Sequence, residues 1–164
     1  MRERIVAGNW KLHGDRVFAR ALLDEVIAAR PAGVRLAIFP PLPYLGELVD
    51  RYGAQGLEFG AQDVDPNEQG AYTGEVSARM LCDVGCRFAM VGHSERRHFH
   101  QESSELVAAK FFAARRAGDP ARTGNAGRGQ QGRLIRWYNS PARIGNGPRP
   151  CPDGGIGRRT TLRW

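Results

Sequence analysis

Apolar residues follow two alternating patterns over the first 118 residues of the chain. Short, mainly apolar runs, which are typical of strands buried on both faces, lie at residues 4–8, 34–39, 57–61 and 87–91. After each run, apolar positions recur at helical spacing, which predicts helices between Asp15 and Pro31 and at residues 44–52, 77–84 and 102–117. Strand followed by helix, four times, predicts a parallel α/β sheet. This pattern fits a barrel or a doubly wound sheet equally well.

The first and last predicted helices carry distinct sets of apolar positions. In the first helix, which Asp15 can cap, these positions are Val17, Phe18, Ala21, Leu22, Val26 and Ile27. In the last helix, the residues expected to face inward are Leu106, Val107, Phe111 and Ala114.

The alternating pattern stops after Gly118. Residues 119–164 contain nine glycines and five prolines and show no apolar periodicity. A segment of this composition buries too little apolar surface to fold, so we expect a disordered Arg/Gly/Pro-rich tail after a folded unit at residues 1–118. Residues 134–138 are the one patch of the tail in which order is plausible, and this patch is too short to stand alone.

The net charge of +7 belongs to the tail, which holds nine arginines, no lysine and two aspartates. Residues 1–118 carry 15 basic and 15 acidic groups and are therefore neutral. This neutral charge does not indicate a basic surface on the folded unit that would bind nucleic acid. The alternative is that the tail itself binds nucleic acid through the arginine and aromatic residues of Gly127-Arg128-Gly129 and Arg136-Trp137-Tyr138. Arginine-rich disorder binds polyanions without selection for it, so such binding would be non-specific.

Three cysteines, an odd number, do not form a disulfide framework, which favours the cytoplasm as the location. No run is apolar enough to predict a membrane span, and the start of the chain lacks the apolar stretch of a signal peptide.

Three segments with polar side chains follow predicted strands, where α/β folds place their active sites. They are Gly8-Asn9-Trp10-Lys11, Gly70-Ala71-Tyr72-Thr73-Gly74-Glu75 and Val91-Gly92-His93-Ser94-Glu95-Arg96-Arg97. Lys11 is one of only two lysines among 24 basic residues, so its compact ammonium suggests a role against a phosphate or a developing oxyanion. A plain surface lysine is the alternative.

His93 lies before Ser94, a possible N-cap. Its ring would then face the positive end of the following helix, which lowers the pKa of the imidazole and favours its neutral form. A purely structural histidine is the alternative.

In their order and spacing, these three segments resemble the triosephosphate isomerase family, and the resemblance covers residues 4–118. It implies a (β/α)8 barrel, of which the chain holds about the first four units. It also implies the interconversion of dihydroxyacetone phosphate and glyceraldehyde 3-phosphate in glycolysis and gluconeogenesis, without a cofactor or a metal.

The same resemblance implies roles for the candidate site residues. Asn9 and Lys11 would line the substrate site, with Lys11 stabilising charge on the enediolate-like intermediate. His93 would donate a hydrogen bond to the substrate carbonyl as a neutral ring. Glu95 would be the acidic neighbour of Lys11, and Ser94 would support the turn.

The family forms homodimers, and the resemblance implies which residues lie at that interface. Thr73 would reach the Asn9 and Lys11 region of the partner subunit, with Glu75 and Gln62 beside it. A solvated salt bridge is the alternative role for Glu75, as it is for Glu95.

The family's second half supplies a carboxylate base, a lid loop and phosphate-binding turns, and the sequence after Gly118 matches none of them. No glutamate follows Glu105. Arginine, glycine and proline have GC-rich codons, so the leading hypothesis is a shifted reading frame near codon 118. We then expect two open sheet edges, an unstable monomer and no useful turnover by the truncated chain alone.

Two further alternatives remain at this stage. A metal site could use His93, His98 and His100 with Glu95, or Cys82 with Cys86, although neither spacing is a strong ligand pattern. A doubly wound nucleotide-binding domain is disfavoured because no Gly-x-Gly-x-x-Gly follows the first strand.

Overall fold

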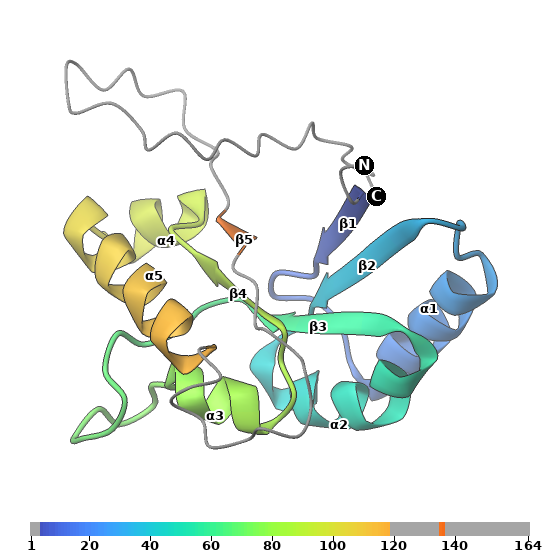
Figure 1. The fold of residues 1–164 in the computed structure, drawn as a ribbon, viewed down its shortest axis with the longest axis horizontal. Coiled ribbons are helices and arrows are strands. Elements are labelled where there is room, and N and C mark those ends of the chain that lie inside the picture. Colours follow the sequence, from blue (N-terminus) through green and yellow to red (C-terminus); the bar gives the residue numbers. More distant parts are fainter. Residues whose placement is uncertain (1–3, 119–134, 137–164) are drawn as a thin grey trace, which may run out of the picture.

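The computed structural model describes residues 4–118 and 135–136, in which strands and helices alternate along the chain (Figure 1). The elements are β1 (Arg4–Asn9), α1 (Arg16–Ala28), β2 (Val34–Phe39), α2 (Leu42–Tyr52), a 3₁₀ turn (Gly53–Gln55), β3 (Leu57–Ala61), α3 (Ala78–Asp83), β4 (Phe88–Val91), α4 (Ser94–Phe99), α5 (Ser104–Ala117) and β5 (Ile135–Arg136). Each strand expected from the apolar runs is present, with ends that differ by at most one residue.

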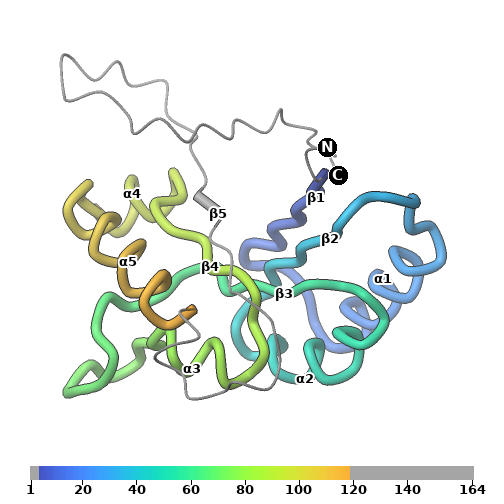
Figure 2. Tube along the Cα trace, viewed as in Figure 1, coloured from blue at the N-terminus to red at the C-terminus, as the bar shows by residue number. Residues whose placement is uncertain are grey.

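The sheet is parallel throughout and its strands follow the order of the chain, β1-β2-β3-β4-β5. A doubly wound sheet would require the strand order to reverse, so the barrel alternative is the correct one. The main strands form a curled half-barrel with helices along its outside, as Figure 1 shows. In Figure 2 the long connection between β3 and α3 extends away from the other elements.

Apolar residues are buried on both faces of this sheet. The larger cluster joins strands to the outer helices and includes Leu23, Leu36, Leu48 and Phe59. A smaller cluster on the opposite face consists of Ala37, Phe39, Phe88 and Met90, with Ala7 beside it. Burial on both faces explains why the strands read as continuous apolar runs rather than as alternating ones.

Gly60 of β3 makes the inner cluster possible. A Cβ atom at this position would lie 2.5 Å from Phe39 Cε1 and 2.8 Å from Phe88 Cβ. Without it, the two aromatic rings approach to 6.2 Å between centroids across the strand that separates them. The missing side chain of one strand therefore lets its two neighbours pack together.

The helix termini confirm some sequence expectations and correct others. Asp15 caps α1, since its carboxylate accepts a hydrogen bond of 2.8 Å from the Phe18 amide. The last helix does not begin at Glu102: Ser103 is its N-cap, and a separate short helix, α4, precedes it. Glu102 is drawn out of the helix because its buried carboxylate is bound by Arg96 and Lys110.

Two of the expected apolar faces are partly wrong. Val17 is 80% exposed and Phe18 is 45% exposed, while Ala19 and Leu23 are the buried residues of α1. On α5, Leu106 is exposed, whereas Lys110 is buried. Helical spacing alone therefore does not determine which side of a helix is buried, because packing against other elements decides it.

Among the described residues the sheet is open, as expected, and its two end strands are β1 and β5. Met90 and Val91 of β4 pair with Ile135 and Arg136, which belong to the one patch of the tail in which order was plausible. The predicted disorder of the rest of residues 119–164 lies outside the described residues. Among those that the structure describes, no helix has the length and hydropathy needed to cross a membrane.

Candidate active site

The candidate site lies where β1 and β4 end. These strands are not neighbours in the sheet, because β2 and β3 lie between them. The curl of the sheet nevertheless brings their carboxyl ends together. Lys11, which follows β1, forms an ion pair with Glu95, in the first turn after β4, at 2.5 Å between Nζ and Oε1. Asn9 Nδ2 likewise lies 3.6 Å from the sulfur of Met90 on β4.

The first side of the site is the turn after β1, which holds Lys11 in an unusual conformation. Its φ angle is +53°, in the left-handed region that non-glycine residues rarely adopt. Asn9 supports this turn, because its side-chain oxygen accepts a hydrogen bond of 2.9 Å from the Lys11 amide. Gln62 fixes the other side by donating to the carbonyl oxygens of Lys11 and Phe39. Such strain is typical of functional sites, where surrounding contacts maintain it.

The second side of the site is formed by His93 and Glu95. His93, rather than Ser94, is the N-cap of α4, and Ser94 is the first helical residue. The Nδ1 atom of His93 accepts a hydrogen bond of 3.2 Å from the Glu95 amide. An accepting Nδ1 carries no proton, so in the neutral ring the proton is on Nε2.

Burial is the main cause that lowers the pKa of His93, and the nearby ammonium of Lys11 lowers it further. The carboxylate of Glu95 acts in the opposite direction but does not outweigh burial. The expected neutral imidazole is thus supported by a hydrogen bond and by desolvation of the ring. The expected cause was the positive end of the helix. In the structure, the helix end contributes one hydrogen bond, from the Glu95 amide, and burial is what lowers the pKa of His93.

The ion pair between Lys11 and Glu95 is accessible. The two side chains are 50% and 44% exposed, respectively. The hydrogen bond from Lys11 lowers the pKa of Glu95, so the carboxylate is charged at neutral pH. An exposed pair of this kind contributes little to stability, and its ammonium can readily turn to a bound anion.

The residues predicted to lie at a subunit interface belong to two separate parts of the structure. Thr73 and Glu75 are exposed in the connection between β3 and α3, in which Glu75 donates its amide to the Tyr72 carbonyl at 3.1 Å. Gln62 lies instead within the turn of Lys11. The contacts of Gln62 within its own chain are those of a residue that supports the site.

The sequence analysis missed a buried ionic cluster behind the site. Asp63, Arg96, Glu102 and Lys110, which we call the anchor cluster, are joined by ion pairs of 2.5 to 2.8 Å. The scarcity of lysine pointed to Lys110 as well as to Lys11, but only burial shows its role. Burial raises the pKa of Glu102, yet hydrogen bonds from Lys110 and Arg96 outweigh this and lower it.

The two alternative metal sets are not supported by the described residues. Within residues 4–118, no three histidine, cysteine, aspartate or glutamate side chains gather where they could hold a metal ion. Burial raises the pKa of Cys86 to about 12 and also raises that of Cys82, so both remain thiols. The possible nucleic-acid segment of the tail lies outside the described side chains.

A comparison with known proteins adds the family. A family model described as triosephosphate isomerase matches residues 4–119. A triosephosphate isomerase of Stenotrophomonas maltophilia (strain K279a) is 66% identical over 119 residues, which are 72% of this chain and 47% of that protein. One of Xanthomonas campestris pv. campestris (strain 8004) is 65% identical over the same shares.

Among solved structures, the crystal structure of triosephosphate isomerase from Bartonella henselae is similar with a TM-score of 0.67 and 35% identity. The match covers 71% of this chain and 49% of that one. The chain therefore spans about half the length of the relatives it matches.

Proposed function

We propose, since the chain belongs to the triosephosphate isomerase family, that its candidate site serves the interconversion of dihydroxyacetone phosphate and glyceraldehyde 3-phosphate, a step of glycolysis and gluconeogenesis. The observation that carries this proposal is the meeting of Lys11, which follows β1, and His93, which follows β4, across a curled sheet. Lys11 lies at 2.5 Å from Glu95, whose amide donates to His93. An ammonium and a neutral imidazole are thereby held at one place.

Each residue has a part in the proposed isomerisation. The Nε2–H of His93 donates a hydrogen bond to the substrate carbonyl, so that negative charge can develop on that oxygen as a carbon-bound proton is removed. Lys11 stabilises the same charge and turns from Glu95 toward the substrate. Asn9 holds the Lys11 turn and lines the site. The proton moves between adjacent carbons, and no redox partner or cofactor is needed.

The base that takes the proton belongs to the family's second half, beyond the matched residues. Glu95 does not fill this role, because it is already the partner of Lys11. We therefore infer that these 164 residues by themselves give no useful turnover, and that a shifted reading frame separates them from the base, lid and phosphate-binding segments. Reading the coding DNA in its other two frames tests the second point: absence of a downstream base segment would contradict it.

The homodimer and the cytoplasmic location are part of the same proposal. Thr73 and Glu75 are exposed, as a subunit contact requires, and Gln62 lies beside the turn that Thr73 of a partner would approach. Sedimentation of the chain, with and without Thr73→Arg, tests this assembly. A dimer that the substitution does not weaken would contradict the assignment of this loop.

Binding can be tested without turnover. Dihydroxyacetone phosphate is titrated into the ¹⁵N-labelled chain while the imidazole signals of His93 are followed, with Lys11→Met as the variant and Arg51→Met on α2 as the matched control. We expect the signals to shift in the unaltered chain and in the control, and not in the Lys11 variant. Unchanged signals in the unaltered chain at millimolar ligand would refute the proposal.

A further inference from the structure

Helix α4 carries one side of the candidate site but is not held by apolar packing. It contains six residues, Ser94–Phe99, and none of them is buried. Phe99, its last residue, is 71% exposed. A single short helix without a buried face is unstable by itself, so something else must fix its direction.

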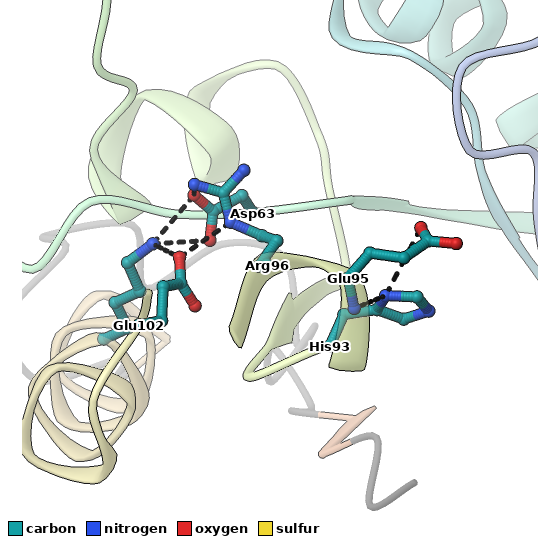
Figure 3. A network of polar contacts seen from close by, with 6 residues as sticks. Asp63, His93, Glu95, Arg96 and Glu102 are labelled. Atoms are coloured by element: carbon teal, nitrogen blue, oxygen red, sulfur yellow. Dashed lines mark hydrogen bonds and ion pairs between the residues drawn. The ribbon is translucent and has the colours of Figure 1, made fainter. Parts of the chain in front are cut away.

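The anchor cluster supplies this fixation through Arg96. The Nε atom of Arg96 donates to Glu102 Oε1, and a terminal nitrogen pairs with Asp63 Oδ2, each at 2.7 Å. Asp63 follows β3 and Glu102 precedes α5, so the two contacts tie α4 to separate elements. Figure 3 shows Arg96 pointing toward Asp63 and Glu102, while His93 and Glu95 point away from them.

We propose that Arg96 is a positioning residue, which sets the direction of His93 and Glu95 by anchoring α4 to two carboxylates behind it, the half-buried Asp63 and the buried Glu102. The proposal rests on the proposed function only for the roles that it gives to His93 and Glu95. The side chain of Arg96 contacts Asp63 and Glu102, on the side of α4 that points away from His93 and Glu95.

The backbone transmits this anchoring over a short path. Successive residues of a helix are rotated by about 100°, so fixing Arg96 fixes the direction of Glu95 on the adjoining side. The Arg97 amide donates to the His93 carbonyl at 3.0 Å, and the His100 amide donates to the Arg96 carbonyl at 2.9 Å. Rotation of the helix would therefore move the Glu95 amide away from His93 Nδ1.

Lys110 makes the proposal testable, because it still pairs with both carboxylates when Arg96 is removed. Its ammonium contacts both oxygens of Asp63 at 2.8 Å and Glu102 Oε1 at 2.5 Å. Loss of Arg96 thus leaves both carboxylates paired, and the sheet and α5 stay in place. The loss should be confined to α4.

The experiment compares the full 164-residue chain with Arg96→Ala, Arg96→Lys and Arg97→Ala. The last variant is the matched control, since Arg97 is the next residue and its side chain donates to the Ser104 hydroxyl at 3.4 Å. Two readouts are used: the imidazole nitrogen signals of His93 as a function of pH, and amide exchange of residues 93–100 against residues 34–39. No substrate is added, so failure of the proposed function does not affect the result.

In the unaltered chain we expect an unprotonated Nδ1, a proton on Nε2 and a pKa of His93 below its ordinary value. In Arg96→Ala we expect mixed tautomers, a pKa that rises toward about 6.5, and exchange in residues 93–100 that is roughly tenfold faster while β2 is unchanged. Arg96→Lys, which can reach one carboxylate only, should fall between the two. Arg97→Ala should match the unaltered chain.

Three results would overturn the proposal. The first is an Arg96→Ala chain with the tautomer and exchange of the unaltered one. The second is equally faster exchange in β2, which would mean that Arg96 stabilises the whole fold. The third is an unaltered chain in which His93 gives the signals of an unstructured histidine, since the cluster would then position nothing.

Discussion

The two lysines of this chain form ion pairs in opposite surroundings. The side chain of Lys11 is 50% exposed, contacts one carboxylate and belongs to a strained turn. That of Lys110 is 5% exposed and contacts two carboxylates, one of them 2% exposed. The first pair leaves its ammonium available to a ligand, whereas the second holds β3, α4 and α5 together. The same kind of charge pair therefore lies at the surface in one case and joins elements of the interior in the other.

Removal of the buried ammonium should have the largest effect. In Lys110→Met, Asp63 and Glu102 keep only Arg96 as a cation, and breaking a buried pair in this way typically costs about 3–5 kcal/mol. The free energy of unfolding from urea titration measures this, with Lys11→Met as the matched control. Equal losses in the two variants would abolish the contrast between the lysines.

The carboxylate partners offer a milder version of the same comparison. Glu102→Gln keeps the shape of the side chain but weakens its buried, charge-assisted hydrogen bonds, so we expect a loss of about 1–3 kcal/mol. Glu95→Gln should change stability by less than about 1 kcal/mol, since its pair is exposed. Urea titrations of both variants give the ranking, which is contradicted if Glu95→Gln proves the more damaging.

Relief of the strained turn should separate binding from stability. Glycine adopts the φ angle of Lys11 without steric cost, so Lys11→Gly should raise the free energy of unfolding by up to about 1 kcal/mol. The same variant should lose the response of His93 to dihydroxyacetone phosphate. A less stable Lys11→Gly chain would show that the ammonium stabilises the turn more than the strain destabilises it.

The smallest effect concerns pH. Burial lowers the pKa of His93. In the pH range where this histidine titrates, the folded chain therefore binds fewer protons than the unfolded chain. Its contribution is present above the ordinary pKa of about 6.5 and is lost as pH falls through the folded value. The slope of unfolding free energy against pH in this range should decrease in His93→Gln. An unchanged slope would place its cause elsewhere.

Much of the local structure could be predicted from sequence. The apolar runs gave every main strand to within one residue, and Asp15 caps the first helix as expected. The resemblance implied that Glu95 lies beside Lys11, and the two side chains form an ion pair in the structure. The buried positions of α1 and α5 were less well predicted. Helical spacing shows which residues share a side of the helix, but it does not show which side packs against the sheet.

The sequence by itself determined the strand and helix pattern, the neutral charge of the first 118 residues and the resemblance that names the family. Only the tertiary structure decided that β1 and β4, with two strands between them in the sheet, meet at their ends, and that Lys110 is buried while Lys11 is exposed. The reason is physical. Local pattern reflects contacts between residues close in the chain, whereas the curl of the sheet and the burial of a charge depend on contacts between residues as far apart as Lys11 and Glu95.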